Sequence, residues 1–283
     1  MEKRSVWKTV GLVALFGALL VLPSLVRGFY YYRGWYDPGE IAKPGYAVGD
    51  LPTVEMAAFV ETDLAQAEGL VVVDRGHGNT FQEVELNVLL SRLTARGVEN
   101  MTLNEGDDLS SALYNALALI VVAPHEPFTS AEVKAVQRFV EQGGRVLLVA
   151  DPSRYAWETR YDEEFGEYQE IESDVAAINT LAASFGLAYS DDYVYNTVKN
   201  GGHYQYVILN EFADHTLTVN LEKVVLYAAH SLASVDEVLI AGDENTTSSL
   251  SEQAGGLTLL GLGGNGNVLA VSDLTFMTEP YNS

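Results

Sequence analysis

Polar residues that could bind a ligand or take part in catalysis follow several apolar segments of this chain. Asp74, His77 and Asn79 come directly after the apolar run Leu70-Val71-Val72-Val73. Carboxylate and imidazole groups together can hold a divalent cation or activate a water molecule. We predict a ligand-binding crevice formed by these residues and by others that stand after later apolar segments, namely His125, Glu126, Asp151 and Asp273.

The same residues also have a purely structural interpretation. Asp74 and Asp151 could cap helices or turns, and His77 and Asn79 could fix their loop through hydrogen bonds to the backbone. We interpret the isolated histidines as surface or strand-pair residues, and these are His203, His215 and His230.

Several kinds of catalytic chemistry lack their usual residues. Cysteine is absent, which excludes a thiolate nucleophile and Cys-ligated metals. No Gly-x-Ser-x-Gly elbow, Walker A loop or strand-to-helix GxGxxG turn occurs. Residues 261–266 are glycine-rich, but no helix is expected after them, and Asn265-Gly266 predicts a hairpin turn instead. We assign no catalytic residue, metal or cofactor. The missing nucleophile and nucleotide-binding motifs favour a protein that is not an enzyme.

Alternating apolar segments predict the elements that would position the candidate residues. Thr129 or Ser130, with Glu132, predicts the capped start of a helix that ends at Gly143-Gly144. A series of strands and helices in alternation predicts a mainly parallel sheet with helices on both faces, whose carboxyl ends share one edge where ligands bind. The expected strands are 70–74, 98–103, 118–123 and 145–150, and the expected helices are 81–96, 109–117 and 131–142.

The pattern changes after the fourth strand. Residues 152–173 are rich in aromatic and acidic side chains, and we interpret them as a lid or excursion loop. A helix is expected over 174–185. The closer spacing of the later strands suggests hairpins and mixed pairing, with strands at 191–196, 203–210, 223–229, 236–241, 256–262 and 267–272.

The N-terminal region predicts a single membrane anchor. Residues 10–28 are apolar for nearly the length that a spanning helix needs, and residues 1–9 form a basic tail. The basic flank predicts a cytoplasmic N-terminus and an α/β domain outside the cell membrane. Residues 29–69 begin with an aromatic collar and continue as a Pro- and Gly-containing spacer, ahead of the α/β domain at 70–283. The alternative is a cleaved signal peptide.

The charge limits the partners of the domain. The formal net charge of the chain is −23, so its surface repels nucleic acid and anionic lipid headgroups. Such a surface fits a solvated, extracytoplasmic or salt-adapted domain. We therefore expect contact with lipid only through the N-terminal helix, and we expect membrane proteins as partners.

Short motifs follow one another in a fixed order along residues 70–277. They are Asp74-x-x-His77-Gly78-Asn79, Ile120-Val121-Val122-Ala123-Pro124, Phe128-Thr129-x-x-Glu132-Val133, Phe139-Val140-x-x-Gly143-Gly144-Arg145-Val146-Leu147-Leu148, Ile178-Asn179-x-Leu181, Phe185-Gly186-Leu187, Asp191-Asp192-Tyr193-Val194 and Val271-Ser272-Asp273-x-x-Phe276. In this order the chain resembles the DUF4350 family and its relatives in the GldG/IFT52-type (GIFT) group.

The resemblance implies a flavodoxin-like fold related to class I glutamine amidotransferase domains, here without the nucleophile. It also implies a membrane-associated protein, some relatives being linked with ABC-type export systems. Members often continue beyond the closing strand, so this chain either lacks that part or is a piece of a longer protein.

Three functions are consistent with these features. The first is a single-pass membrane protein whose extracytoplasmic domain is a non-enzymatic binding or assembly module of a larger membrane complex. The second is a metal-assisted hydrolase or sugar-binding enzyme that uses the Asp and His residues at the strand ends. The third is a solute-binding module that feeds a transporter, with residues 152–173 as its lid.

Overall fold

The N-terminal unit of the protein contains one long apolar helix. The computed structural model describes residues 3–32, 67–162, 164, 166–251 and 254–278, and it divides into the units Met1–Ala57 and Ala58–Ser283. Helix α1 spans Lys3–Tyr32, and within it Val10–Tyr31 is long and apolar enough to cross a membrane, with a mean hydropathy of 2.1. Its length fits a membrane anchor or a signal sequence near the N-terminus.

The helix extends further than the sequence predicts. Phe29, Tyr30 and Tyr31 belong to its last turn, whereas we expected the aromatic collar to follow the helix. The remainder of the collar and most of the spacer lie in residues 33–66, outside the described residues.

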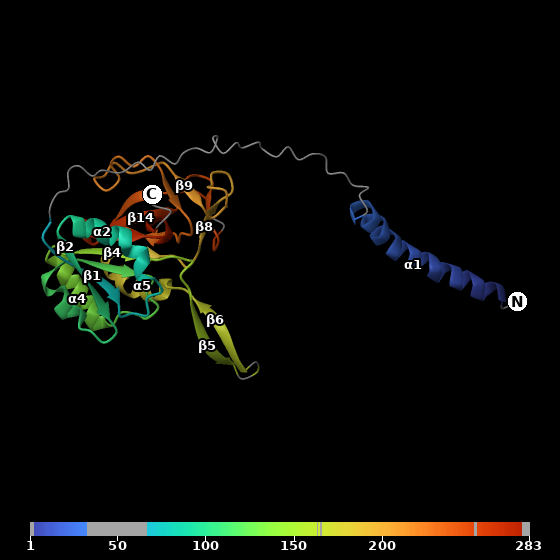
Figure 1. Cartoon of the computed structure of the whole chain (residues 1–283), viewed down its shortest axis with the longest axis horizontal. Helices are drawn as coiled ribbons and strands as arrows, with labels where there is room; N and C mark the ends of the chain where they lie inside the picture. Colours follow the sequence, from blue (N-terminus) through green and yellow to red (C-terminus); the bar gives the residue numbers. More distant parts are fainter. Residues whose placement is uncertain (1–2, 33–66, 163, 165, 252–253, 279–283) are drawn as a thin grey trace. The chain divides into compact units, whose positions relative to one another are not determined.

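A nine-stranded mixed sheet forms the centre of the second unit (Figure 1). The first strands in the sheet order are parallel, as predicted, and they are β2 (Val98–Asn104), β1 (Gly69–Arg75), β3 (Ala116–Val122), β4 (Arg145–Val149) and β15 (Val268–Val271). The order continues with antiparallel strands, namely β14 (Thr258–Gly263), β11 (Leu232–Ser234) and β7 (Ala188–Tyr189), and β12 (Glu237–Ala241) also pairs with β14.

Helices cover both faces of the parallel strands, as predicted. Successive strand residues point to opposite faces, so Val72 packs in one core and Val71 and Val73 pack in the other. The first core also receives α3 (Leu109–Ala112), η3 (Leu113–Asn115), α4 (Ser130–Glu141), α5 (Val175–Ala182) and η4 (Ala183–Phe185). The second core receives η2 (Glu83–Leu86), α2 (Asn87–Ala95) and η6 (Thr275–Met277).

The C-terminal half adds short hairpins, in agreement with the closer spacing of its apolar segments. β14 and β15 form the hairpin predicted at Asn265-Gly266, with a turn of η5 (Gly264–Gly266). Two smaller sheets pair β8 (Val194–Asn196) with β13 (Thr246–Ser248) and β9 (Val207–Leu209) with β10 (Val224–Leu226). These strands are shorter than predicted, because loops occupy much of 191–196, 203–210 and 223–229.

The segment predicted as an irregular lid is a β-hairpin. Strand β5 (Ala156–Asp162) pairs antiparallel with β6 (Gly166–Glu172), and the hairpin projects from the body of the domain (Figure 1). Alternation of aromatic or β-branched residues with charged ones along β5 explains the extended structure. The loop predicted at 152–173 is therefore mostly a pair of strands, and its role as a lid stays a prediction.

Candidate functional site

The first group of candidate residues lies where the sheet order changes direction, between β1 and β3. Asp74 is fully buried at the end of β1. Its Oδ1 accepts a 3.1 Å hydrogen bond from the Gly76 amide and lies 2.9 Å from His77 Nδ1. Its Oδ2 accepts a 3.2 Å bond from the side-chain amide of Asn79. The residues predicted to act together after β1 are therefore in direct contact.

The imidazole of His77 is held between two carboxylates. Its Nε2 lies 3.5 Å from Glu132 Oε1, on the side opposite Asp74, and its ring stacks on Phe128 with centroids 3.7 Å apart. Glu132 also completes the predicted capping box of α4, where Thr129 is the N-cap residue. The Glu132 carboxylate therefore contacts both the first turn of α4 and the loop after β1.

The surroundings of His77 favour the charged imidazolium. Burial alone lowers the pKa of His77, but the hydrogen bond to Asp74 and the charges of Asp74 and Glu132 raise it above its ordinary value. Burial raises the pKa of Glu132, while its hydrogen bonds with Thr129 and the charge of His77 bring the pKa below the ordinary value. The two carboxylates therefore stabilise a positive charge on His77.

The loops after β1 and β3 are tied together by further hydrogen bonds. The side-chain nitrogen of Asn79 donates to the backbone carbonyl of Val122 at 2.8 Å, and its side-chain oxygen Oδ1 accepts from the His77 backbone amide at 3.1 Å. The backbone amides of His125 and Glu126 both donate to the His77 carbonyl at 2.9 Å. The candidates after β3 thus support this loop through their backbone, while the Glu126 side chain is exposed.

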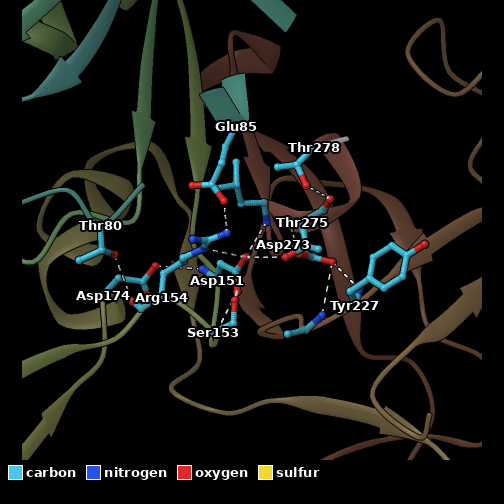
Figure 2. A network of polar contacts seen from close by, with 12 residues as sticks. Thr80, Glu85, Asp151, Ser153, Arg154, Asp174, Tyr227, Asp273, Thr275 and Thr278 are labelled. Atoms are coloured by element: carbon cyan, nitrogen blue, oxygen red, sulfur yellow. Dashed lines mark hydrogen bonds and ion pairs between the residues drawn. The ribbon is translucent and has the colours of Figure 1, made fainter. Parts of the chain in front are cut away.

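The second group lies at the ends of β4 and β15. Val149 pairs with Val271 in register, so Asp151 and Asp273 follow at matching positions, and both are fully buried (Figure 2). Asp151 accepts hydrogen bonds from the Ser153 amide at 2.8 Å and the Leu274 amide at 3.0 Å. These bonds place it in the turn-forming role that the structural interpretation predicted.

Asp273 is a buried acid beside another acid. Burial, followed by the charge of Asp151, raises the pKa of Asp273 to about 8. Its Oδ2 accepts from the Tyr227 amide at 2.5 Å, and its Oδ1 accepts from the Thr275 amide at 2.7 Å. Burial and the neighbouring carboxylate therefore both disfavour a negative charge on Asp273.

Arg154 joins the two groups, and nothing in the sequence pattern marked it. Figure 2 shows its guanidinium between Glu85, with which it forms an ion pair, and Asp151, whose Oδ2 lies 4.0 Å from Arg154 Nε. Its carbonyl oxygen lies 3.0 Å from the Nε2 of His125. Through Arg154 and His125, the predicted candidates form one connected polar edge.

A third group contains a histidine that the sequence analysis misplaced. His230 is buried, contrary to our surface or strand-pair interpretation. Its Nε2 lies 3.3 Å from Asp174 Oδ1, and its Nδ1 lies 2.5 Å from the Asp192 carbonyl. Asp174 also accepts a 2.9 Å hydrogen bond from the Asp151 amide. The hydrogen bond between Asp151 and Asp174 therefore connects His230 to the residues at the carboxyl ends of the strands.

The pKa values of Asp174 and His230 both lie above their ordinary values. Burial alone lowers the pKa of His230, but the Asp174 hydrogen bond and charge, with the Asp192 carbonyl, raise it above the ordinary value. Burial raises the pKa of Asp174. A cavity of about 330 Å³ adjoins the pair, and its wall includes Asp151, Arg154, Tyr155, Tyr193 and His230.

The ring nitrogens of His77 and His230 are already engaged by neighbouring groups. A general base needs an acceptor atom free to reach the substrate. Both ring nitrogens of His77 face carboxylates, and those of His230 face a carboxylate and a carbonyl. Within the described residues, no three His, Asp or Glu side chains converge as a set of metal ligands.

Comparisons with known proteins place the chain in a family of unknown function. A family model described as "Domain of unknown function (DUF4350)" matches residues 85–279. A protein of Aquifex aeolicus (strain VF5), described as uncharacterized, is 26% identical over 170 residues, which cover 58% of this chain and 64% of that protein. This chain therefore spans a little under two thirds of the length of that relative.

Two solved structures are also similar to this one. The mmIFT52 N-terminal domain has a TM-score of 0.53 and 13% identity, over 75% of this chain and 89% of that domain. A ThuA-like protein from Parabacteroides merdae has a TM-score of 0.37 and 13% identity, over 72% of this chain and 79% of that protein. At this identity, the first likeness shows the fold alone, and it confirms the predicted resemblance to IFT52-type domains.

Proposed function

Because this chain belongs to the DUF4350 family, a domain of unknown function, we propose its role from its own residues: a membrane-anchored binding module without enzymatic activity. The domain would act in a larger membrane complex, on the extracytoplasmic side. ABC-type export systems are one class of complex that fits the resemblance described above. The match over residues 85–279 includes most of the α/β domain, so the proposal concerns that domain together with its anchor.

One observation carries the proposal: buried carboxylates and imidazoles at the carboxyl ends of the strands already form hydrogen bonds or ion contacts within the domain. Asp74, Asp151 and Asp273 each accept backbone amide hydrogen bonds, as expected for residues that organise turns. The imidazoles of His77 and His230 have both nitrogens occupied. A rigid edge of this kind can present a fixed surface to a ligand or partner, while the imidazoles of His77 and His230 are not free to accept a proton from a substrate.

The strand order supports a finer description of the fold. The parallel strands follow the order β2-β1-β3-β4-β15, which corresponds to the flavodoxin-like order with a switch point between β1 and β3. Ala123 follows β3 with a φ of 40°, in a region that alanine seldom adopts. We therefore propose a relative of the glutamine amidotransferase-like fold in which a strained strand end carries a methyl group in place of a nucleophile.

The anchor and the orientation rest on α1. Val10–Tyr31 could cross a membrane, and the basic residues Lys3, Arg4 and Lys8 stand at its N-terminal side. Positively charged flanks remain in the cytoplasm, which supports an extracytoplasmic α/β domain. Helix α1 would then hold the domain at the membrane surface, where membrane-protein partners are available.

A second candidate function is favoured by the cavity beside His230. Its volume of about 330 Å³ lies within the range of small-ligand sites, and Arg154, Tyr155 and Tyr193 contribute polar and aromatic groups to its wall. In this alternative the domain binds a small solute for a transporter. A rise in melting temperature with a solute, lost when Tyr193 is replaced by alanine, would favour it over the assembly role.

Extraction from native membranes tests the assembly role. The full chain, tagged and expressed at its natural level, would be solubilised in mild detergent and its mass measured on native gels and by light scattering. We expect a species well above the 30.8 kDa of the chain plus its detergent, with the same partner in stoichiometric amount in every preparation. A monomer without a retained partner would contradict the proposal.

A further inference from the structure

One face of the β5–β6 hairpin carries exposed aromatic and aliphatic side chains. The register places Trp157 opposite Ile171, Thr159 opposite Gln169 and Tyr161 opposite Glu167 on this face. The side chains are 58% (Trp157), 56% (Ile171) and 75% (Tyr161) exposed. Tyr155, at the base of the same face, meets the Trp157 ring edge-on with centroids 5.8 Å apart. Exposed aromatic clusters of this kind mark surfaces that bind other molecules.

The opposite face of the hairpin is acidic. Glu158 stands opposite Glu170, and Ala156 stands opposite Glu172. Arg160 is the basic residue on this face, and it forms ion pairs with Glu158 at 2.9 Å and with Glu170 at 3.0 Å. Strand β6 carries Glu167, Glu170 and Glu172 and no basic residue, whereas Arg160 offsets part of the acidic charge of β5, so the net negative charge is greater along β6.

The outer edge of β6 is open. In the described part of the chain, β5 and β6 form a two-stranded sheet of their own, and no other strand pairs with β6. Such an edge presents backbone donors and acceptors to any extended segment that approaches it. A two-stranded hairpin is marginally stable by itself, so a third strand would stabilise it.

We propose that the outer edge of β6 binds an extended segment of a protein partner by strand addition, and that this segment alternates basic and apolar residues. The proposal rests on the proposed function, because it names the surface through which the module assembles. Alternate residues of an added strand point to opposite faces of the sheet. Lys or Arg side chains would then lie beside Glu170 and Glu172, and apolar ones beside Ile171.

Two other occupants of the hairpin fit its charges less well. A second copy paired through β6 would bring Glu170 and Glu172 against the same acidic residues. An anionic membrane surface would meet the acidic face of a chain whose net charge is −23. A basic strand is instead attracted to β6, whereas Arg160 on β5 would repel it.

A designed peptide tests the pairing directly. The probe is an acetylated and amidated peptide in which lysine and valine alternate. Two control peptides are matched to it. One is a block isomer of the same composition, in which all the lysines precede all the valines. The other has the same alternating order but N-methylated valines, which lose their backbone donors. Binding to the full chain in detergent would be followed by amide hydrogen exchange and by fluorescence of Trp157, with Trp7 and Trp35 replaced by phenylalanine. We expect the alternating peptide to bind at least tenfold more tightly than either control and to slow exchange along 166–172.

Variants of the chain locate the site. Glu170→Gln/Glu172→Gln should weaken the alternating peptide at least tenfold, while Glu99→Gln/Glu105→Gln, which neutralises two exposed acids on and after the edge strand β2, should leave affinity unchanged within twofold. Hydrogen exchange of the peptide-free variants checks that β5 and β6 remain paired. Equal binding of the block isomer, or loss of binding in the β2 variant, would overturn the proposal.

Further outcomes separate this proposal from its alternatives. Dimerisation of the full chain that Glu170→Gln/Glu172→Gln strengthens would identify a second copy as the occupant and overturn strand addition by a partner. Binding of phosphatidylcholine–phosphatidylglycerol vesicles that depends on Trp157 but not on Glu170 would assign the hairpin to lipid and overturn it as well. A partner complex that survives both hairpin substitutions would overturn this inference alone, whereas a monomer that still binds the alternating peptide would overturn only the proposed function.

Discussion

His230 and Asp174 form an ion pair in which both side chains are almost completely buried, with 2% and 1% of their surfaces exposed. The two residues come from distant parts of the chain and meet beside the carboxyl end of β4, where Asp174 also binds the Asp151 backbone. Two ions of opposite charge removed from water depend on each other, because either one alone would be an uncompensated buried charge.

Replacement of His230 by alanine should therefore be strongly destabilising. We expect the free energy of unfolding to fall by about 3–5 kcal/mol, the usual cost of breaking a buried pair by removing one partner. His203→Ala is the matched control, because His203 is exposed and its loss should cost no more than about 0.5 kcal/mol. Urea unfolding of the full chain in mild detergent gives both values, and equal stability of the two variants would contradict the buried pair.

His77 should titrate above its ordinary pKa of 6.5. Replacement of Glu132 by glutamine removes one of the two carboxylates beside the ring, so the pKa of His77 should fall, while Asp74 continues to hold Nδ1. Nitrogen-detected NMR titration of the imidazole measures both values. Glu126→Gln, which changes an exposed acid of the neighbouring loop, serves as control. A His77 pKa that does not move in Glu132→Gln would contradict the role assigned to Glu132.

The stability of the domain should decrease as the pH rises toward 8. Asp273 has a pKa of about 8 when folded, against an ordinary value of 3.8, so the folded state binds the proton more tightly. The stabilisation is complete below 3.8 and is lost as the pH rises through about 8, at a rate of at most about 1.4 kcal/mol per pH unit. His77 and His230 act in the same direction above pH 6.5, because their pKa values are also raised.

A variant isolates the contribution of Asp273. Asp273→Asn cannot titrate, so its free energy of unfolding should fall less steeply between about pH 5 and 8 than that of the unaltered chain. The Asn side chain also loses one acceptor for the Tyr227 or Thr275 amide, which lowers stability at every pH without changing the slope. Urea unfolding at several pH values measures the two slopes, and parallel slopes would show that Asp273 is already ionised.

The anchor should depend on the apolar centre of α1. Leu19→Arg/Leu20→Arg places two charges at mid-helix, at an insertion cost of about 2.5–3.5 kcal/mol each, so the chain should move from the membrane to the soluble fraction. Leu19→Ala/Leu20→Ala is the control and should remain in the membrane after carbonate washing. Retention of the arginine variant in the membrane would argue that another segment holds the chain there.

The positions of several site residues could be predicted from local sequence alone. Asp74 and Asp151 each end an apolar run, and the alternation of strands and helices places such ends on one edge. Glu132 was recognised as part of a helix cap for the same reason, because the Thr129-x-x-Glu132 spacing is local. Its second contact, with His77, depends on the approach of α4 to the loop after β1, and no local spacing encodes that approach.

Other features depend on residues that are far apart in the chain. His230 and Asp174 are separated by 56 positions, and Arg154 meets Glu85 across 69. Neither pair leaves a pattern in the sequence around its residues, so His230 was interpreted as a surface or strand-pair residue. The hairpin was missed for another reason: acidic side chains lower the apparent β propensity of 156–172, while the alternation of Trp157, Thr159 and Tyr161 favours a strand.

The hydrogen bond from the Asp151 amide to the Asp174 carboxylate has a consequence for how this protein can change over time. The chain leaves the sheet at one of these residues and rejoins the domain at the other, so the intervening hairpin begins and ends at the same place. Insertions, deletions or exchanges within it would leave the directions of β4 and α5 unaltered. Descendants of one ancestral scaffold could thus acquire different specificities by varying this segment alone, and the same boundary offers protein engineers a natural point for grafting.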